Sequence, residues 1–142
     1  MGVPVGSKLD AGLDVAEPIR DDGVDLIVYR RKGDGAFYAR PIQLKTSTTA
    51  RFAIDRKYER REGLIMAYVW GRERSTIYAL AYDPDVNDIA RKMGWEDTDS
   101  WRTGGHNKKP GWSCYPNPKL LKLLSPFEAT PDRWRTLQES RS

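Results

Sequence analysis

The stretch Asp21–Thr49 reads DDGVDLIVYRRKGDGAFYARPIQLKTSTT and decides the fold. Its segments Val24–Tyr29 and Phe37–Lys45 are rich in β-branched and aromatic residues, which favours two strands. Between them, Arg30–Gly35 (RRKGDG) contains an Asp-Gly pair and two glycines, a composition typical of a tight turn. The stretch therefore predicts a β-hairpin, and we expect the rest of the chain to support it.

Side-chain alternation predicts a polar cluster on one face of this hairpin. Successive side chains of a strand point to opposite faces, so Gln43 and Lys45 share one face while Ile42 and Leu44 share the other. Asp25 is a charged residue within an apolar strand, and burying an unpaired charge is unfavourable. A divalent metal ion and a neighbouring lysine would satisfy it. The pattern predicts that an acid, an amide oxygen and an ammonium group meet on one face.

These residues carry a family resemblance. Gly23–Val28 (GVDLIV), a hairpin and then Ile42–Ser47 (IQLKTS) resemble the core of the PD-(D/E)XK nuclease superfamily, over roughly the first half of the chain. That superfamily includes restriction endonucleases, archaeal Holliday junction resolvases and some intron-encoded homing endonucleases. The resemblance implies a Mg²⁺-dependent endonuclease acting on duplex or branched DNA, with Mn²⁺ as a substitute. By analogy with such nucleases, it also implies a homodimer.

The resemblance assigns roles to individual residues. Asp25 matches the metal-binding acid, and Gln43 matches the second acid position, which is Gln in a minority of members. Mg²⁺ prefers oxygen ligands, which Asp25, the Gln43 side chain and the backbone carbonyl of Leu44 would supply. Lys45 matches the motif lysine, which would orient or deprotonate a metal-activated water, or stabilise charge in the transition state.

Polar and basic residues follow the second strand and are candidates for contacting the phosphate backbone. Asp55 predicts the cap of a short helix over residues 56–62, whose basic side chains would lie on neighbouring turns. The predicted nucleic-acid contacts are Thr46, Ser47, Thr48, Arg56, Lys57 and Arg60. The alternatives are an ordinary loop for the hydroxyl residues and a solvated charged face for the helix.

The remaining pattern predicts one α/β domain over residues 1–142, with a nuclease-like core at about 13–93. We expect a mixed, mostly antiparallel sheet of four or five strands flanked by helices, as in a restriction-endonuclease-like core. Outside the hairpin, the expected strands are Leu13–Ile19 at an edge, Leu64–Trp70 and Thr76–Tyr82. The expected helices are 84–93 and two short ones after Asn117 and Thr130, with a tryptophan-rich loop at 95–116.

Composition narrows the chemistry. Cys114 and His106 are the single cysteine and histidine of 142 residues, which excludes an internal disulfide and a cysteine-cluster zinc site. No segment resembles a signal peptide or membrane span, so we expect a cytoplasmic protein without membrane contact. No glycine-rich phosphate loop follows a strand, so a nucleotide cofactor is not expected. The net charge of +4 suits a polyanion partner.

Two further interpretations stay open. Gln43 removes one negative charge from the metal site, and Glu17, the one glutamate before Asp25, lies beside Pro18 and is not expected to be a ligand. These two features motivate the second interpretation, in which the protein is a nuclease-like module that binds nucleic acid or protein without cutting DNA. The third interpretation is a protein-binding subunit whose contact surface is the aromatic C-terminal loop. The tryptophans of that loop either plug the core or, beside Arg102, Lys108 and Lys109, stack on unpaired bases.

Overall fold

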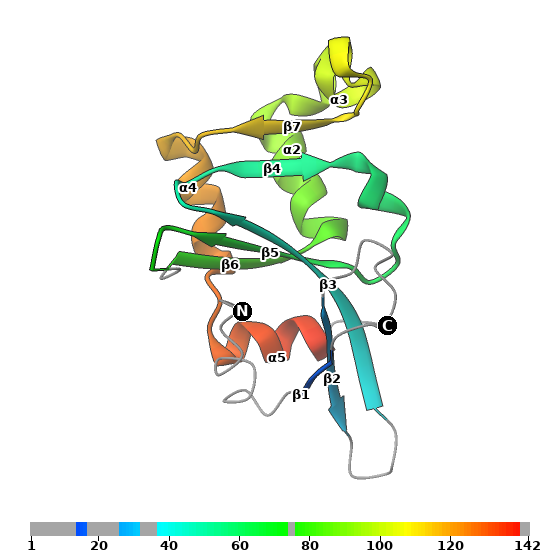
Figure 1. The fold of residues 1–142 in the computed structure, drawn as a ribbon, viewed down its shortest axis with the longest axis vertical. Coiled ribbons are helices and arrows are strands. Elements are labelled where there is room, and N and C mark those ends of the chain that lie inside the picture. Colours follow the sequence, from blue (N-terminus) through cyan, green and yellow to red (C-terminus); the bar gives the residue numbers. More distant parts are fainter. Residues whose placement is uncertain (1–13, 17–25, 32–36, 74–75, 140–142) are drawn as a thin grey trace.

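A five-stranded mixed sheet forms the centre of the molecule in the computed structural model, which describes residues 14–16, 26–31, 37–73 and 76–139 (Figure 1). The strand order is β1–β2–β3–β5–β6. These strands span Asp14–Ala16 (β1), Leu26–Arg31 (β2), Phe37–Ser47 (β3), Ile65–Trp70 (β5) and Thr76–Ala81 (β6). The predicted α/β class and the mixed, mostly antiparallel sheet are confirmed.

One pair of neighbouring strands in the described part of the sheet is parallel, and the other pairs are antiparallel. β1–β2, β2–β3 and β5–β6 are antiparallel pairs, whereas β3 and β5 run parallel, from Ile42 opposite Ile65 to Ser47 opposite Trp70. Every residue of β5 is buried, as its nearly continuous apolar sequence predicted, because β5 has a strand on each side and a layer on each face. The predicted edge strand is present as the three residues of β1.

A second, two-stranded sheet contains one strand from the connection between the parallel strands β3 and β5 and one strand from much later in the chain. The chain between β3 and β5 forms β4 (Phe52–Asp55) and then η1 (Arg56–Arg60), a 3₁₀ helix capped by Asp55, where a short helix was predicted over residues 56–62. β4 pairs in antiparallel fashion with β7 (Gly111–Cys114). Gly111 has φ +157°, and a Cβ there would lie 2.0 Å from the carbonyl oxygen of Ile54. The two strands approach so closely at this point that only glycine fits.

The prediction of an irregular loop at residues 95–116 is wrong. This segment contains η3 (Trp95–Asp97), α3 (Asp99–Thr103), η4 (Gly105–Asn107) and β7. β4 and β7 are each only four residues long, which is too short for a clear strand pattern in the sequence, and they lie far apart along the chain. The pairing is a tertiary effect that overrides a glycine-rich and polar local composition.

Two predicted helix boundaries are confirmed, the start of one helix and the end of another. Asn117 accepts a hydrogen bond from the backbone N–H of Leu120 (2.9 Å) and caps α4 (Pro118–Leu124). Gly94, with φ +77°, ends α2 (Asn87–Met93), which follows η2 (Tyr82–Val86). The chain closes with η5 (Ser125–Phe127) and α5 (Pro131–Glu139). None of the helices in the described ranges combines the length and apolarity that a membrane span requires.

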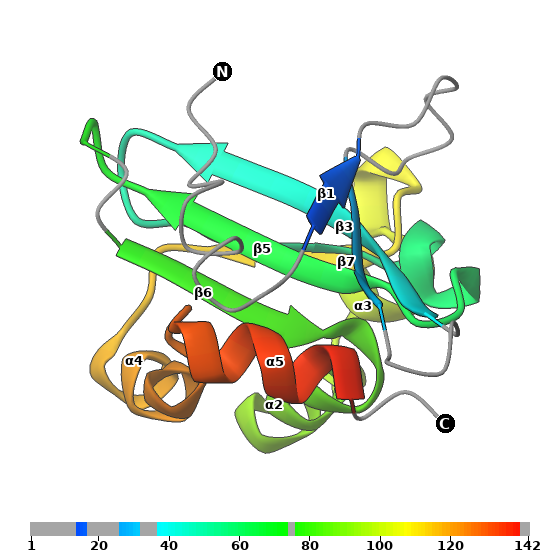
Figure 2. The same ribbon diagram turned by 90° about the horizontal axis from the view of Figure 1, so that it is seen from below.

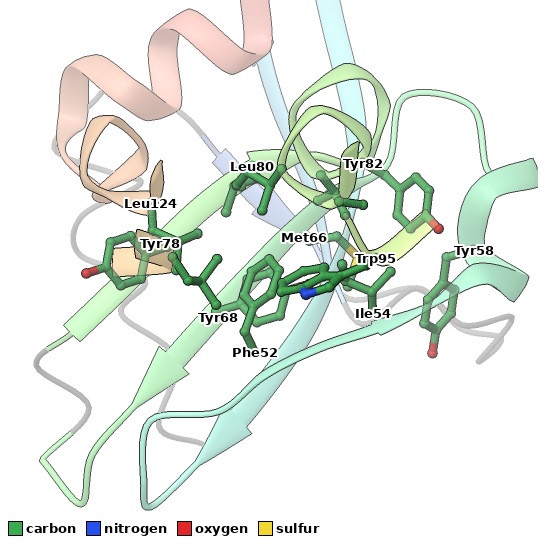
Figure 3. Packing of buried hydrophobic residues seen from close by; sticks show 14 of the residues in the cluster. Phe52, Ile54, Tyr58, Met66, Tyr68, Tyr78, Leu80, Tyr82, Trp95 and Leu124 are labelled. Atoms are coloured by element: carbon green, nitrogen blue, oxygen red, sulfur yellow. The ribbon is translucent and has the colours of Figure 1, made fainter. Parts of the chain in front are cut away.

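The central sheet lies between two layers of different thickness (Figures 1 and 2). On one face, the β4–β7 sheet, α2 and α4 enclose a core rich in aromatic rings, and Figure 3 shows Phe52, Tyr68 and Trp95 packed in it. On the other face, α5 covers a smaller core. The smaller core consists of Leu26, Ile42, Ile65, Ala67, Ala79, Ala81 and Leu137.

Candidate active site and nucleic-acid interface

β3 presents Gln43 and Lys45 to the aromatic side of the sheet. Ile42 is fully buried in the small core under α5, and Leu44 packs against the same core. Strand alternation therefore directs Gln43 and Lys45 to the opposite face. Gln43 is buried, with 8% of its surface exposed, whereas Lys45 is half-buried at the border of the aromatic layer. The predicted pairing of these two side chains on one face agrees with this placement.

The predicted acid, Asp25, lies outside the described residues, so its distance from Gln43 and Lys45 is not given by the structure. Its neighbour in sequence, Leu26, begins β2 and is in register with Ile42 of β3. Leu44 is in register with Ala67 of β5, within the interior of the sheet. The metal roles of Asp25, Gln43 and the Leu44 carbonyl stay predictions.

Lys45 extends toward η1 and contacts an aromatic ring there. Its Nζ lies 5.3 Å from the centroid of the Tyr58 ring, and Nζ of Lys57 lies 5.0 Å from the same centroid. Tyr58 is buried, so its ring forms a fixed surface beneath the two ammonium groups. Tyr58 was absent from the sequence-based site. Its position between the basic residues of η1 was the available signal.

A cavity of about 330 Å³ opens beside Lys45. It lies where β3, β4, β7 and the loop after α3 meet, and Asp55 of β4 is the carboxylate on its wall. Asp55 already accepts a hydrogen bond from the backbone N–H of Lys57 (3.0 Å) and pairs with the Lys57 ammonium at 3.7 Å. Lys45 and Asp55 therefore line the same cavity, but the Asp55 carboxylate is already engaged as the cap of η1.

A second cavity, of about 540 Å³, adjoins the first at Asp55, Lys109 and Pro110. We call the two cavities together the basic groove. Its charged lining consists of Lys45, Asp55, Arg56, Lys57, Glu59, Arg60, Arg102, Lys108 and Lys109. Of the predicted nucleic-acid contacts, the three basic residues of η1 lie here. The groove brings seven cationic side chains together against two carboxylates.

The predicted hydroxyl contacts lie elsewhere. Thr46, Ser47 and Thr48 border a separate hollow of about 180 Å³ beside Gly71 and Arg72, at the β5–β6 turn. Thr46 and Thr48 are exposed, and the Ser47 hydroxyl accepts a hydrogen bond from the backbone N–H of Thr49 (3.3 Å). These residues therefore do not line the basic groove.

Arg56 joins the two sides of the groove. Its guanidinium forms an ion pair with Glu59 (3.2 Å) and donates to the carbonyl of Trp101 (2.8 Å), above whose ring it lies at 5.4 Å. Its backbone N–H donates to the carbonyl of Pro110 (2.9 Å). Arg56 is thus a structural tie as well as a cation, whereas Arg60 is exposed at the rim.

The loop opposite η1 has an unusual backbone. Lys108 has φ +54° and ψ +33°, a left-handed conformation that costs about 1–3 kcal/mol for a residue other than glycine. Gly104 packs so tightly that a Cβ would lie 2.0 Å from the backbone nitrogen of Lys109. The surrounding contacts hold the Lys108–Lys109 pair in one defined position.

The tyrosine Tyr82 and the cysteine Cys114 are poor candidates for proton transfer. Burial raises the pKa of Tyr82 well above its usual range, and the charge of Glu59 raises it further. Burial also raises the pKa of the Cys114 thiol, so the thiolate needed for nucleophilic chemistry is disfavoured. Among the described residues, no three His, Cys, Asp or Glu side chains lie together in a group that could hold a metal ion.

Comparison with known proteins yields no relative: no family model, no curated protein and no solved structure matches the chain.

Proposed function

We propose that the protein is a metal-dependent DNA endonuclease whose chemistry takes place on the face of β3 that carries Gln43 and Lys45. One observation supports this above all: Lys45, at the edge of that face, borders a groove whose lining contains seven cationic side chains. A phosphodiester backbone is the polyanion that such a lining would attract. Lys45 would then stand where the bound backbone passes β3.

The oxygen donors of the proposed site suit Mg²⁺. The amide oxygen of Gln43, the carboxylate of Asp25 and the carbonyl of Leu44 are hard ligands, and Mg²⁺ takes few protein ligands of this kind. Bound there, the ion would lower the pKa of a water and neutralise phosphate charge. The proposal requires Asp25 to lie beside Gln43. The residues that follow Asp25 and precede Gln43 in the sequence, Leu26 and Ile42, are paired in the β2–β3 register.

Lys45 would act on the attacking water and on the phosphate. The half-buried Lys45 lines the smaller cavity of the groove, and its Nζ lies 5.3 Å from the centroid of the Tyr58 ring, a contact that restricts its motion. A fixed positive charge stabilises the charge that develops on phosphate oxygens in the transition state. Gln43 would position the metal-bound water from the same strand.

Cleavage of plasmid and branched DNA with Mg²⁺ or Mn²⁺ tests the proposal. We expect Asp25→Ala and Lys45→Ala each to lower the rate by about 10²–10³-fold, the range typical for removing one transition-state contact. Lys122→Ala is the matched control, because Lys122 is an exposed lysine of α4 that lines neither cavity of the groove. Equal cleavage by the wild type and both site variants would reject the assignment.

A second function, DNA binding without cleavage, is favoured by the neutral and buried side chain of Gln43. A metal site with one carboxylate fewer binds Mg²⁺ more weakly, and a buried amide reorganises less easily around an ion. This alternative predicts salt-dependent DNA binding together with no calorimetric signal on Mn²⁺ titration. Mn²⁺ binding that disappears in Asp25→Ala would decide for the nuclease.

A further inference from the structure

The basic groove has two walls from distant parts of the chain. η1 forms one wall with Arg56, Lys57 and Arg60, and α3 with its following loop forms the other with Arg102, Lys108 and Lys109. Lys109 also borders the smaller cavity that contains Lys45. The second wall therefore extends from the η1 end of the groove to the proposed catalytic lysine.

The second wall is held in place by backbone contacts. The carbonyls of Trp101 and Pro110, at its two ends, accept hydrogen bonds from Arg56 of the first wall (2.8 and 2.9 Å). Within it, the backbone N–H of Lys108 donates to the carbonyl of Gly105 (3.3 Å), and just outside its two ends the Ser100 hydroxyl donates to the carbonyl of Gly111 (3.0 Å). Lys108 and Lys109 are thus exposed cations on a fixed backbone.

Little of the charge in this wall is neutralised by stable pairing. Arg102 lies 3.7 Å from Asp97, whose side chain is 88% exposed, and such surface pairs are weak. Lys108 and Lys109 are exposed at successive positions beside it. Bringing these cations together is unfavourable unless an anion binds between the walls, which points to a ligand with several negative charges.

The aromatic rings near the groove are not available to stack on bases. Trp101 is buried and covered by the Arg56 guanidinium, and the half-buried Trp112, which lines the smaller cavity, is stacked on the ring of the buried Trp95 at 5.4 Å. Tyr115 is an exposed aromatic side chain near this end of the chain, but it is not part of the lining and already contacts Arg51. The groove offers charges for phosphates without a platform for unpaired bases.

We propose that the segment from Arg102 to Pro110 is a phosphate-binding wall for duplex DNA, with Arg102, Lys108 and Lys109 contacting the backbone. It works with η1 on the opposite side, and it positions the duplex beside Lys45. This inference rests on the proposed function for the identity of the ligand. It assigns to the tryptophan-rich segment a role through its lysines and arginine, and not through its aromatic rings.

Fluorescence anisotropy with labelled DNA in EDTA tests this wall, because no cleavage occurs without metal. We expect a duplex to bind more tightly than either of its single strands, and two unrelated duplex sequences to bind equally. Each lost phosphate contact on B-DNA reduces the slope of log K against log salt by about 0.9. The double variant Lys108→Gln/Lys109→Gln should therefore lower the slope by about 2.

The matched control is Lys92→Gln/Lys122→Gln, which removes the same charge from exposed positions on α2 and α4 outside the groove. It should leave the slope unchanged. A groove variant that behaves like this control would overturn the proposal, as would tighter binding of the single strands. Tighter binding of duplex RNA than of duplex DNA would overturn the assignment to DNA.

Lys108→Gly guards against a folding artefact. Glycine adopts the left-handed conformation at this position without strain, so the variant should melt at a higher temperature and still lose about 0.9 of the slope. A normal slope in this variant would contradict a phosphate contact at Lys108. Binding is measured without metal, so the two proposals can fail separately. If the wild type shows the expected salt dependence of DNA binding but does not cleave DNA with metal, the nuclease proposal alone is rejected. If the wild type does not prefer duplex over single-stranded DNA, the wall proposal alone is rejected.

Discussion

The two faces of the central sheet are built from side chains of different size, although the same strands supply both. β5 sends Met66 and Tyr68 into the thick aromatic layer and Ile65 and Ala67 into the thin layer under α5. Large rings keep the β4–β7 sheet away from the central sheet, whereas small residues let α5 pack closely. The border of the thick layer is where Lys45 and the basic groove lie, so the sorting by size creates the space that the proposed chemistry uses.

The largest predicted effect breaks the thick layer. Phe52 is fully buried between the rings of Tyr68 (4.4 Å) and Trp95 (6.0 Å). Phe52→Ala removes these contacts and leaves a cavity, so we expect a loss of about 3–5 kcal/mol in the free energy of unfolding, measured with urea. Ala53→Gly at the next position of β4 tests whether the loss comes from the ring and not from the strand. A loss below that of the Gly variant would contradict the thick-layer interpretation.

A smaller effect tests the thin layer by overfilling it. Ala79 of β6 is fully buried beneath α5, and its carbonyl accepts a hydrogen bond from Arg133 of that helix (3.0 Å). Ala79→Leu should push α5 away and lower the free energy of unfolding by about 1–3 kcal/mol. The substitution should also increase the rate of amide hydrogen exchange more in α5 than in α2. Ala50→Leu, at an exposed position, should change stability by less than about 0.5 kcal/mol. Equal effects of the two substitutions would mean that the layer is not tightly packed.

The smallest effect concerns pH. The Tyr68 hydroxyl donates to the carbonyl of Ala53 (2.8 Å) and thereby joins the two sheets, and burial raises its pKa well above the usual value of 10. Tyr68→Phe should cost about 0.5–1.5 kcal/mol at neutral pH, because the carbonyl loses its donor.

The sign of the pH effect follows from linkage. The raised pKa means that the unfolded chain releases the Tyr68 proton first, above pH 10, and native stability then falls as pH rises further. Tyr68→Phe lacks this proton, so its deficit should shrink above pH 10 in urea titrations at stepped pH. A deficit that grows with pH would show that the hydroxyl is not buried as described.

Much of the fold was predictable from local pattern. The alternation in β2 and β3, the apolar run of β5, the glycine after α2 and the Asn117–Pro118 start of α4 each specify their own element. The placement of Gln43 and Lys45 on one face follows from the same alternation, whereas the functions assigned to them stay predictions.

What the sequence could not show depends on contacts between distant segments. β4 and β7 are each four residues long and become recognisable only when paired. That pairing brings the loop after α3 against η1, and the left-handed backbone of Lys108 is set by this packing, as is the tight fit at Gly104. The second wall of the groove was therefore hidden inside a segment whose composition predicted an irregular loop.

The proposed metal site on β3 is tested most directly by a crystal structure grown with Mn²⁺, using anomalous scattering to locate the ion. The nuclease proposal predicts an ion about 2.1 Å from the amide oxygen of Gln43 and from an oxygen of Asp25, with Lys45 beside its water ligands. An ion held by Asp55 in the groove, or none near β3 at saturating Mn²⁺, would contradict it.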